Sequence, residues 1–145
     1  MSVYHNTLFH ERVPKTADEF KVLRRRLSKT QREMAQLLGT SIKAIHSYEQ
    51  GWRTIPPHAE RQMLFLVSRK STRKVVPCWK VKRCPSDLRS HCPASEFKAS
   101  QICWFINGTI CDGEAMPNWR EKMAKCRSCE VFNHLFGSEI KDGSQ

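Results

Sequence analysis

The sequence has no run of apolar residues that approaches the roughly 20 that a membrane-spanning helix requires. Its first ten residues also lack the apolar segment of a secretory signal peptide. With only 6 Gly and 7 Pro among 145 residues, the composition excludes a flexible linker protein. We therefore expect a cytoplasmic, globular protein without a membrane partner, of a length that suits one domain or two small ones.

Residue sets that perform common enzymatic reactions are also missing. We find no Ser/His/Asp set, no phosphate-binding glycine loop and no carboxylate pair that argues for hydrolysis or group transfer. These absences predict that the protein is not an enzyme.

Cysteine is absent from residues 1–77, and all seven cysteines lie between Cys78 and Cys129. An odd number excludes complete pairing into disulfides within one chain, and a reducing cytoplasm disfavours structural disulfides. Clustered cysteines in a cytosolic chain more often bind a metal or a cluster, or perform redox chemistry. The second half of the chain is therefore the candidate for such a site.

The charge divides the chain at the same place. Residues 1–77 carry 15 basic and 6 acidic side chains, whereas residues 78–145 carry 10 and 8. The basic first half predicts a polyanionic partner, nucleic acid ahead of an anionic membrane surface. We expect an arm at 1–15, a helical domain at 16–70, a basic linker at 71–77, a Cys-rich domain at 78–137 and a tail at 138–145.

Helix signals follow one another through residues 16–70. Capping boxes at Thr16–Glu19 and Thr30–Glu33 predict two helix starts, and Gly39 suits a helix end. Thr40-Ser41 can cap a third helix, and Pro56–Pro57 open a fourth. The predicted fold is mainly α, with a four-helix domain followed by a small Cys-rich domain stabilised by a metal or a cluster.

The second and third predicted helices are joined by Gly39-Thr40-Ser41, which is helix-turn-helix spacing. Ala35 is small where the two helices would cross, and Ile45 is placed to hold the second helix to the core. The residues Thr30–Ser41, Ile45, Tyr48–Gly51 and Pro56 together resemble the Cro/C1-type (Xre) helix-turn-helix of phage repressors and bacterial regulators.

This resemblance covers about residues 16–70 and implies binding to a double-stranded DNA operator. Seven residues would contact DNA: Gln31, Ser41, Ile42, Lys43, His46, Ser47 and Arg53. Gln31 and Arg53 would hold the backbone, while Ile42, Lys43 and Ser47 would face base edges, with Ser41 and His46 beside them. A partly buried Ile42 is the alternative. We expect Arg24–Arg26 to form a solvated face.

The cysteine spacing is C-x5-C-x7-C-x10-C-x7-C-x14-C-x2-C, with a single C-x2-C at Cys126 and Cys129. Zinc fingers and ribbons usually have two close pairs, so the fit to them is poor. Cys126 and Cys129 lie near the start of a predicted helix that ends at Gly137, and a helix N-terminus stabilises thiolates. Aromatic residues are expected to pack a small core around the site: Trp79, Phe97, Trp104, Phe105, Trp119 and Phe132.

This half also resembles a known module. Cys78-Trp79, Cys84, Cys92-Pro93-Ala94, Cys103-Trp104, Gly108-Thr109, Cys111, Cys126, Cys129 and Phe132 look like the two-CW domain, which occurs in bacteria alone or attached to signalling modules. The match covers roughly residues 78–136. The candidate ligands are all seven cysteines: Cys78, Cys84, Cys92, Cys103, Cys111, Cys126 and Cys129. We expect His91 and His134 to lie on the surface.

Three interpretations of the cysteines remain open. Four of them could hold an iron–sulfur cluster of the 4Fe–4S type, several could hold a structural zinc, or they could form a thiol–disulfide switch. We expect a homodimeric, sequence-specific DNA-binding transcriptional regulator whose cluster senses redox state, oxygen or iron. The alternatives are a zinc-stabilised regulator without sensing and a small iron–sulfur redox or electron-transfer protein.

Overall fold

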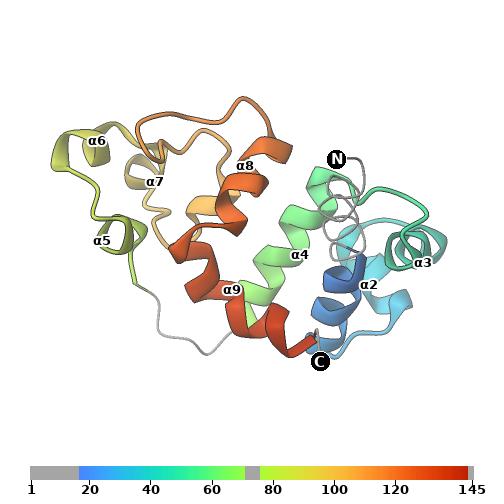
Figure 1. The fold of residues 1–145 in the computed structure, drawn as a ribbon. Coiled ribbons are helices and arrows are strands. Elements are labelled where there is room, and N and C mark those ends of the chain that lie inside the picture. Colours follow the sequence, from blue (N-terminus) through green and yellow to red (C-terminus); the bar gives the residue numbers. More distant parts are fainter. Residues whose placement is uncertain (1–16, 71–75, 144–145) are drawn as a thin grey trace, which may run out of the picture. The chain divides into compact units, whose positions relative to one another are not determined.

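The computed structural model describes residues 17–70 and 76–143, with side chains through Gly137. Within these ranges the regular structure is helical, apart from an isolated bridge between Cys111 and Glu114, so the prediction of a mainly α protein is confirmed (Figure 1). None of the helices described there is long and apolar enough to cross a membrane. The predicted arm, the cap at Thr16 and most of the predicted linker lie outside the described residues.

The chain divides into two compact units. The first unit runs through Lys70 and includes Ser138–Gln145, and the second unit is Ser71–Gly137. Through Lys70 the helices are residues 17–26, α2 (Gln31–Leu38), α3 (Ile42–Gln50) and α4 (Pro57–Lys70). After the linker they are α5 (Cys78–Lys82), α6 (Ser86–His91), α7 (Pro93–Glu96), the 3-10 helix η1 (Cys103–Phe105), α8 (Trp119–Arg127) and α9 (Glu130–Gly143).

The helices α2 and α3 begin and end where the sequence predicts. Thr30 Oγ1 accepts the Glu33 N–H at 3.1 Å, and the Glu33 carboxylate accepts the Thr30 N–H at 2.9 Å, which completes the capping box. Gly39 ends α2 with φ 68°, in the left-handed region that favours glycine. Ser41 caps α3 by accepting the Ala44 N–H at 3.0 Å. Local hydrogen bonds therefore fix the short turn between the two helices.

The core of the first unit takes apolar side chains from each of these helices. Met34 of α2, Ile45 of α3 and Met63 of α4 are almost completely buried. Phe20 packs edge-on against Tyr48, with ring centroids 5.6 Å apart. Each large buried side chain of this kind stabilises the fold by about 1.5–3 kcal/mol. This packing holds α3 by one face only.

A buried ion pair joins three helices of the first unit. Arg24 Nε and Nη2 donate to the two carboxylate oxygens of Glu49 at 2.5 and 3.0 Å, and Gln31 Nε2 donates to the same carboxylate at 3.1 Å. The side chains of Arg24 and Glu49 are 12% and 1% exposed. The prediction of a solvated Arg24–Arg26 face is therefore wrong at Arg24, because the buried carboxylate of α3 needs a charged partner.

The second unit consists of short helices and turns around a small aromatic core. The ring of Trp104 lies edge-on to Phe136 at 5.4 Å between centroids, and Phe132 lies 4.7 Å from Phe136. Phe97, which we expected in this core, is instead 66% exposed. The four-residue helix α7 ends at Phe97, and the chain then turns at Lys98, whose φ of 52° is left-handed, so the Phe97 ring is left outside the core.

Two predictions about the C-terminal helices are wrong. Cys126 lies in the last turn of α8, and only Cys129 directly precedes a helix, α9. Only one of the two thiols that we expected at a helix N-terminus, Cys129, therefore lies at one. The helix α9 also continues through Gly137 to Gly143, because Gly137 does not adopt the positive φ with which Gly39 ends α2.

Candidate functional site

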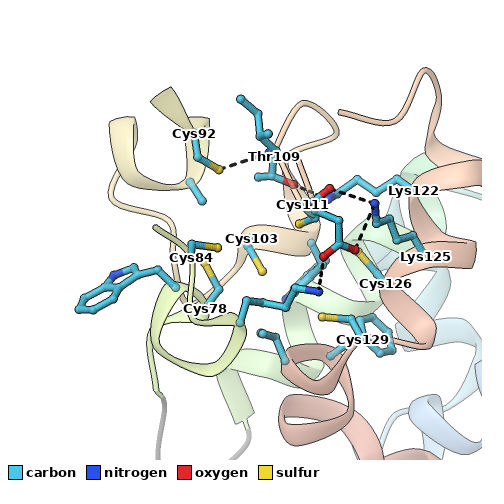
Figure 2. Close-up of a pocket in the computed structure, with 18 of the residues that line it drawn as sticks. Cys78, Cys84, Cys92, Cys103, Thr109, Cys111, Lys122, Lys125, Cys126 and Cys129 are labelled. Atoms are coloured by element: carbon cyan, nitrogen blue, oxygen red, sulfur yellow. Dashed lines mark hydrogen bonds and ion pairs between the residues drawn. The ribbon is translucent and has the colours of Figure 1, made fainter. Parts of the chain in front are cut away.

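All seven cysteines line one cavity of about 150 Å³ in the second unit (Figure 2). Each is a free thiol. They come from Cys78 at the start of α5, Cys84 and Cys92 on either side of α6, Cys103 in η1, Cys111 in the bridged turn, Cys126 at the end of α8 and Cys129 before α9. A cavity of about this volume accommodates a group the size of benzene. The fold thus gathers thiols that are widely spaced in the sequence around one small space.

The thiols surround the cavity without forming a compact ligand set. In the part of the chain that the structure describes, no group of three or more His, Cys, Asp or Glu side chains is arranged to hold a metal ion. Figure 2 shows the sulfur atoms spread around the cavity, on segments that approach it from different sides. His91 and His134 are exposed, as expected, and neither lines the cavity.

Two of the thiols form a hydrogen-bonded pair. The bond from Cys103 lowers the pKa of Cys78 to about 7, and the same bond together with burial raises the pKa of Cys103. Cys78 is therefore partly ionised at neutral pH, and the thiolate is the form that binds metals and acts as a nucleophile. Burial raises the pKa of Cys84 instead.

A backbone group also contacts sulfur in this cavity. The Ile110 N–H donates to Cys92 Sγ at 3.3 Å. Hydrogen bonds to sulfur are among the means by which proteins tune iron–sulfur clusters.

Positive charge is concentrated around the thiols. Lys82 and Lys125 form ion pairs with the exposed carboxylate of Asp112, at 3.2 and 3.4 Å. The hydrogen bond from Lys82 lowers the pKa of Asp112. Lys122 is only 3% exposed and donates to Thr109 Oγ1 at 2.5 Å. Four basic and two acidic side chains line the cavity, so its lining has a net charge of +2 when the thiols are protonated.

Aromatic side chains close part of the cavity wall. Trp104 and Phe132 line the cavity and are 1% and 3% exposed. Trp79 is covered on one face by the Arg89 guanidinium, 4.3 Å from the ring centroid. The buried indole N–H of Trp104 has no hydrogen-bond acceptor among the described residues. The cavity thus combines thiols, cations and a donor without a partner.

The exposed face of α3 is the second candidate site. Ile42 is 39% exposed, and Lys43 and His46 are exposed beside it, with the cap Ser41 at the start of the same helix. Positions 42 and 46 lie one above the other on a helix. Four of the seven expected DNA-contacting residues therefore lie at the surface of one helix and its cap.

The other three expected contact residues are placed differently from one another. Arg53 is exposed, and its guanidinium lies 5.7 Å from the centroid of the Tyr48 ring. Gln31 is half-buried, and its amide is bonded to the Glu49 carboxylate. Ser47 is only 7% exposed, contrary to the expectation that it faces base edges, because position 47 lies on the packed side of α3 next to Tyr48.

One exposed aromatic residue beside α3 escaped the sequence analysis. Trp52 is 70% exposed and contacts His46 edge-on, with ring centroids 5.3 Å apart. It follows Gly51, which ends α3 with φ 78°. A large aromatic residue directly after a helix-ending glycine, next to a basic residue, is the signal that could have identified it.

The described residues thus form two candidate sites. One is the thiol-lined cavity of the second unit, and the other is the exposed face of α3 in the first unit. The chain matches no protein-family model, no curated protein and no solved structure.

Proposed function

We propose that the protein is a DNA-binding transcriptional regulator of the Cro/C1 type, with α2 as the supporting helix and α3 as the recognition helix. The observation that carries the proposal is the geometry of α3. One of its faces is fixed by Ile45 and Tyr48 in the core, and the other presents Ile42, Lys43 and His46 to the surroundings. A helix held in this way can enter a major groove while its support stays packed.

The chemistry of the exposed residues agrees with this role. Lys43 can donate to the O6 and N7 acceptors of guanine, and Ile42 can contact a thymine methyl group. Arg53 lies beyond the end of α3 and suits a phosphate contact. Gln31 is held by Glu49, but one of its two amide hydrogens and its amide oxygen remain for a phosphate or a water. Ser47 has no place in this interface.

A selection from a library of random duplexes tests the DNA-binding function. We expect the full-length protein to enrich one sequence motif. Lys43→Ala should weaken binding to the best site by about 1–3 kcal/mol and relax the preference at one base. Arg53→Ala should weaken binding to all sequences alike and reduce the salt slope by about one. Arg69→Ala, an exposed change in α4, is the control for net charge. If no motif is enriched, the proposal is rejected.

We further propose that the second unit, which resembles a two-CW domain, holds an iron–sulfur cluster in its cavity. The support is the convergence of seven thiols on one small space with aromatic walls and a positively charged lining. Thiolates are the ligands of 4Fe–4S clusters, and a shielded pocket limits the access of water. When bound, a cluster supplies one-electron redox chemistry and sensitivity to oxygen. Four of the seven cysteines suffice for ligation.

Anaerobic purification tests the cluster. We expect a brown protein with broad visible absorption that bleaches in air, and a ratio of iron to sulfide near one. Cys126→Ser should abolish the colour while the helices through Lys70 stay folded, and Ser90→Ala in α6 is the exposed control. A colourless protein with one equivalent of zinc would identify the zinc-stabilised alternative, and a folded, metal-free protein would favour thiol chemistry.

We propose that the regulator binds DNA as a homodimer, because one short recognition helix buries little surface on DNA. Two such helices would read half-sites about 34–36 Å apart, one turn of DNA. Sedimentation of the full-length protein, with and without the enriched duplex, measures the stoichiometry. We expect two chains per duplex, and a single chain bound with full affinity contradicts the dimer.

A further inference from the structure

Lys122 of α8 is the most deeply buried charged side chain beside the cavity. The residue is 3% exposed, and it lines the cavity together with Cys111 and Cys126. Its ammonium group donates to Thr109 Oγ1, and it also forms a hydrogen bond with the Cys126 thiol. A protonated thiol and a hydroxyl carry no charge, so neither of these partners balances the charge of Lys122.

The neighbouring lysines differ from Lys122 in this respect. Lys82 and Lys125 share the exposed carboxylate of Asp112 at the edge of the cavity. Throughout the residues that the structure describes, no carboxylate forms an ion pair with Lys122. A buried charge without an opposite charge costs several kcal/mol in a protein interior. The negative charge that balances Lys122 must therefore come from the adjacent cavity, either from an ionised thiol or from a bound guest.

The cavity wall also contains a hydrogen-bond donor without an acceptor. The indole N–H of Trp104 is buried without an acceptor in the described part of the chain, and Trp104 lines the same cavity. Buried donors in folded proteins nearly always have an acceptor. Two independent features of the wall, a charge and a donor, thus point to an anionic guest that offers acceptor atoms.

We propose that Lys122 is the countercharge of the cavity: its buried ammonium group balances the negative charge of a thiolate-bound cluster and sets the cluster's reduction potential. This inference rests on the proposed cluster and names the residue that tunes it. Lys122 is a positioning and tuning residue, and it is not a ligand. A nearby positive charge stabilises the more negative, reduced state, so Lys122 raises the reduction potential.

Redox titration of the anaerobically purified full-length protein tests the proposal, with dithionite as the electron donor and electron paramagnetic resonance as the readout. We expect Lys122→Met to lower the ratio of reduced to oxidised cluster at a fixed potential at least tenfold, a shift of about 59 mV for one electron. Lys122→Arg should restore most of the potential, because it keeps the charge. Arg120→Met is the matched control, since Arg120 is an exposed cation of the same helix and does not line the cavity. A potential unchanged in Lys122→Met overturns the proposal.

The protein without a cluster provides the second readout. Removal of an unbalanced buried charge should raise the melting temperature of the cluster-free protein in Lys122→Met. If Lys122 only braces Thr109, the same substitution lowers the melting temperature, and this result rejects the countercharge role even if Lys122→Met cannot be loaded. If the wild-type protein takes up no cluster, the proposed cluster is rejected. The melting experiment does not need a cluster, so it still tests whether Lys122 carries an unbalanced charge.

Discussion

Replacing Arg24 with Met tests how the recognition helix is held in place. The substitution keeps the length of the side chain and removes its guanidinium, so the Glu49 carboxylate of α3, 1% exposed, loses its charged partner. Glu49 keeps one hydrogen bond, from Gln31. The substitution therefore removes the hydrogen bonds that link the Glu49 carboxylate of α3 to the helix over residues 17–26, while its bond to α2 remains.

Removal of one partner from a buried ion pair costs about 3–5 kcal/mol. Because Arg24 is 12% exposed and Gln31 still contacts Glu49, we expect a value near the lower limit, about 3 kcal/mol. A small domain has a stability of about 5–15 kcal/mol, so this loss would be a large fraction of the whole. The double variant Arg24→Met with Glu49→Met should regain most of the stability, because it buries no unpaired charge.

Hydrogen exchange measured by mass spectrometry resolves the two units of the full-length chain. Since 1.4 kcal/mol is a factor of ten, the α3 amides that exchange by unfolding of the first unit should exchange about a hundredfold faster in Arg24→Met. Peptides of the second unit should keep their wild-type rates. Equal α3 rates in Arg24→Met and wild type would refute the argument that this ion pair holds α3, and so would a double variant less stable than Arg24→Met.

The remaining predictions concern single residues. Gly39→Ala should destabilise the first unit by about 1 kcal/mol or more, measured by the same exchange, because φ is 68° although the added methyl group meets no atom within 4 Å. Thr30→Ala should cost about 1 kcal/mol by loss of the cap. Alkylation of Cys78 by iodoacetamide should rise with a midpoint near pH 7, and Cys103→Ala, which removes the hydrogen bond to Cys78, should move that midpoint upward. Because the folded pKa of Cys78 is below the unfolded value, its thiolate stabilises the cluster-free protein at high pH, and this contribution is lost as the pH falls through about 7.

Features that depend on neighbours in the sequence could be predicted. The capping box of Thr30, the cap at Ser41 and the left-handed Gly39 each follow from residues within four positions, and all three are found. Gly137 shows the limit of such rules. The same residue type continues a helix there, because a glycine ends a helix only where the backbone turns left-handed.

Features that depend on packing could not be predicted so well. Ser47 is inaccessible because it lies on the buried face of α3. Arg24 is mostly buried because it forms an ion pair with the buried carboxylate of Glu49. The cysteine spacing identified the ligand candidates but not their convergence on one cavity, since that depends on turns with no regular period.

The burial of Lys122 did leave a signal in the sequence. Trp119, Lys122, Met123 and Cys126 recur at helical spacing, and all four are buried in α8. A lysine on the apolar stripe of a short helix is therefore a signal in the sequence for a buried lysine side chain.

The wide spacing of the thiols also has a consequence for chain entropy. A guest bound by both Cys78 and Cys129 closes a loop of about 50 residues. In a simple cross-link treatment, this closure lowers the conformational entropy of the unfolded chain and stabilises the folded state by about 4 kcal/mol. This gain is of the same size as the whole core contribution of many domains of fewer than 80 residues. Departure of the guest would therefore loosen α5 through α9 together, so the contents of the cavity and the order of this segment would change as a single event.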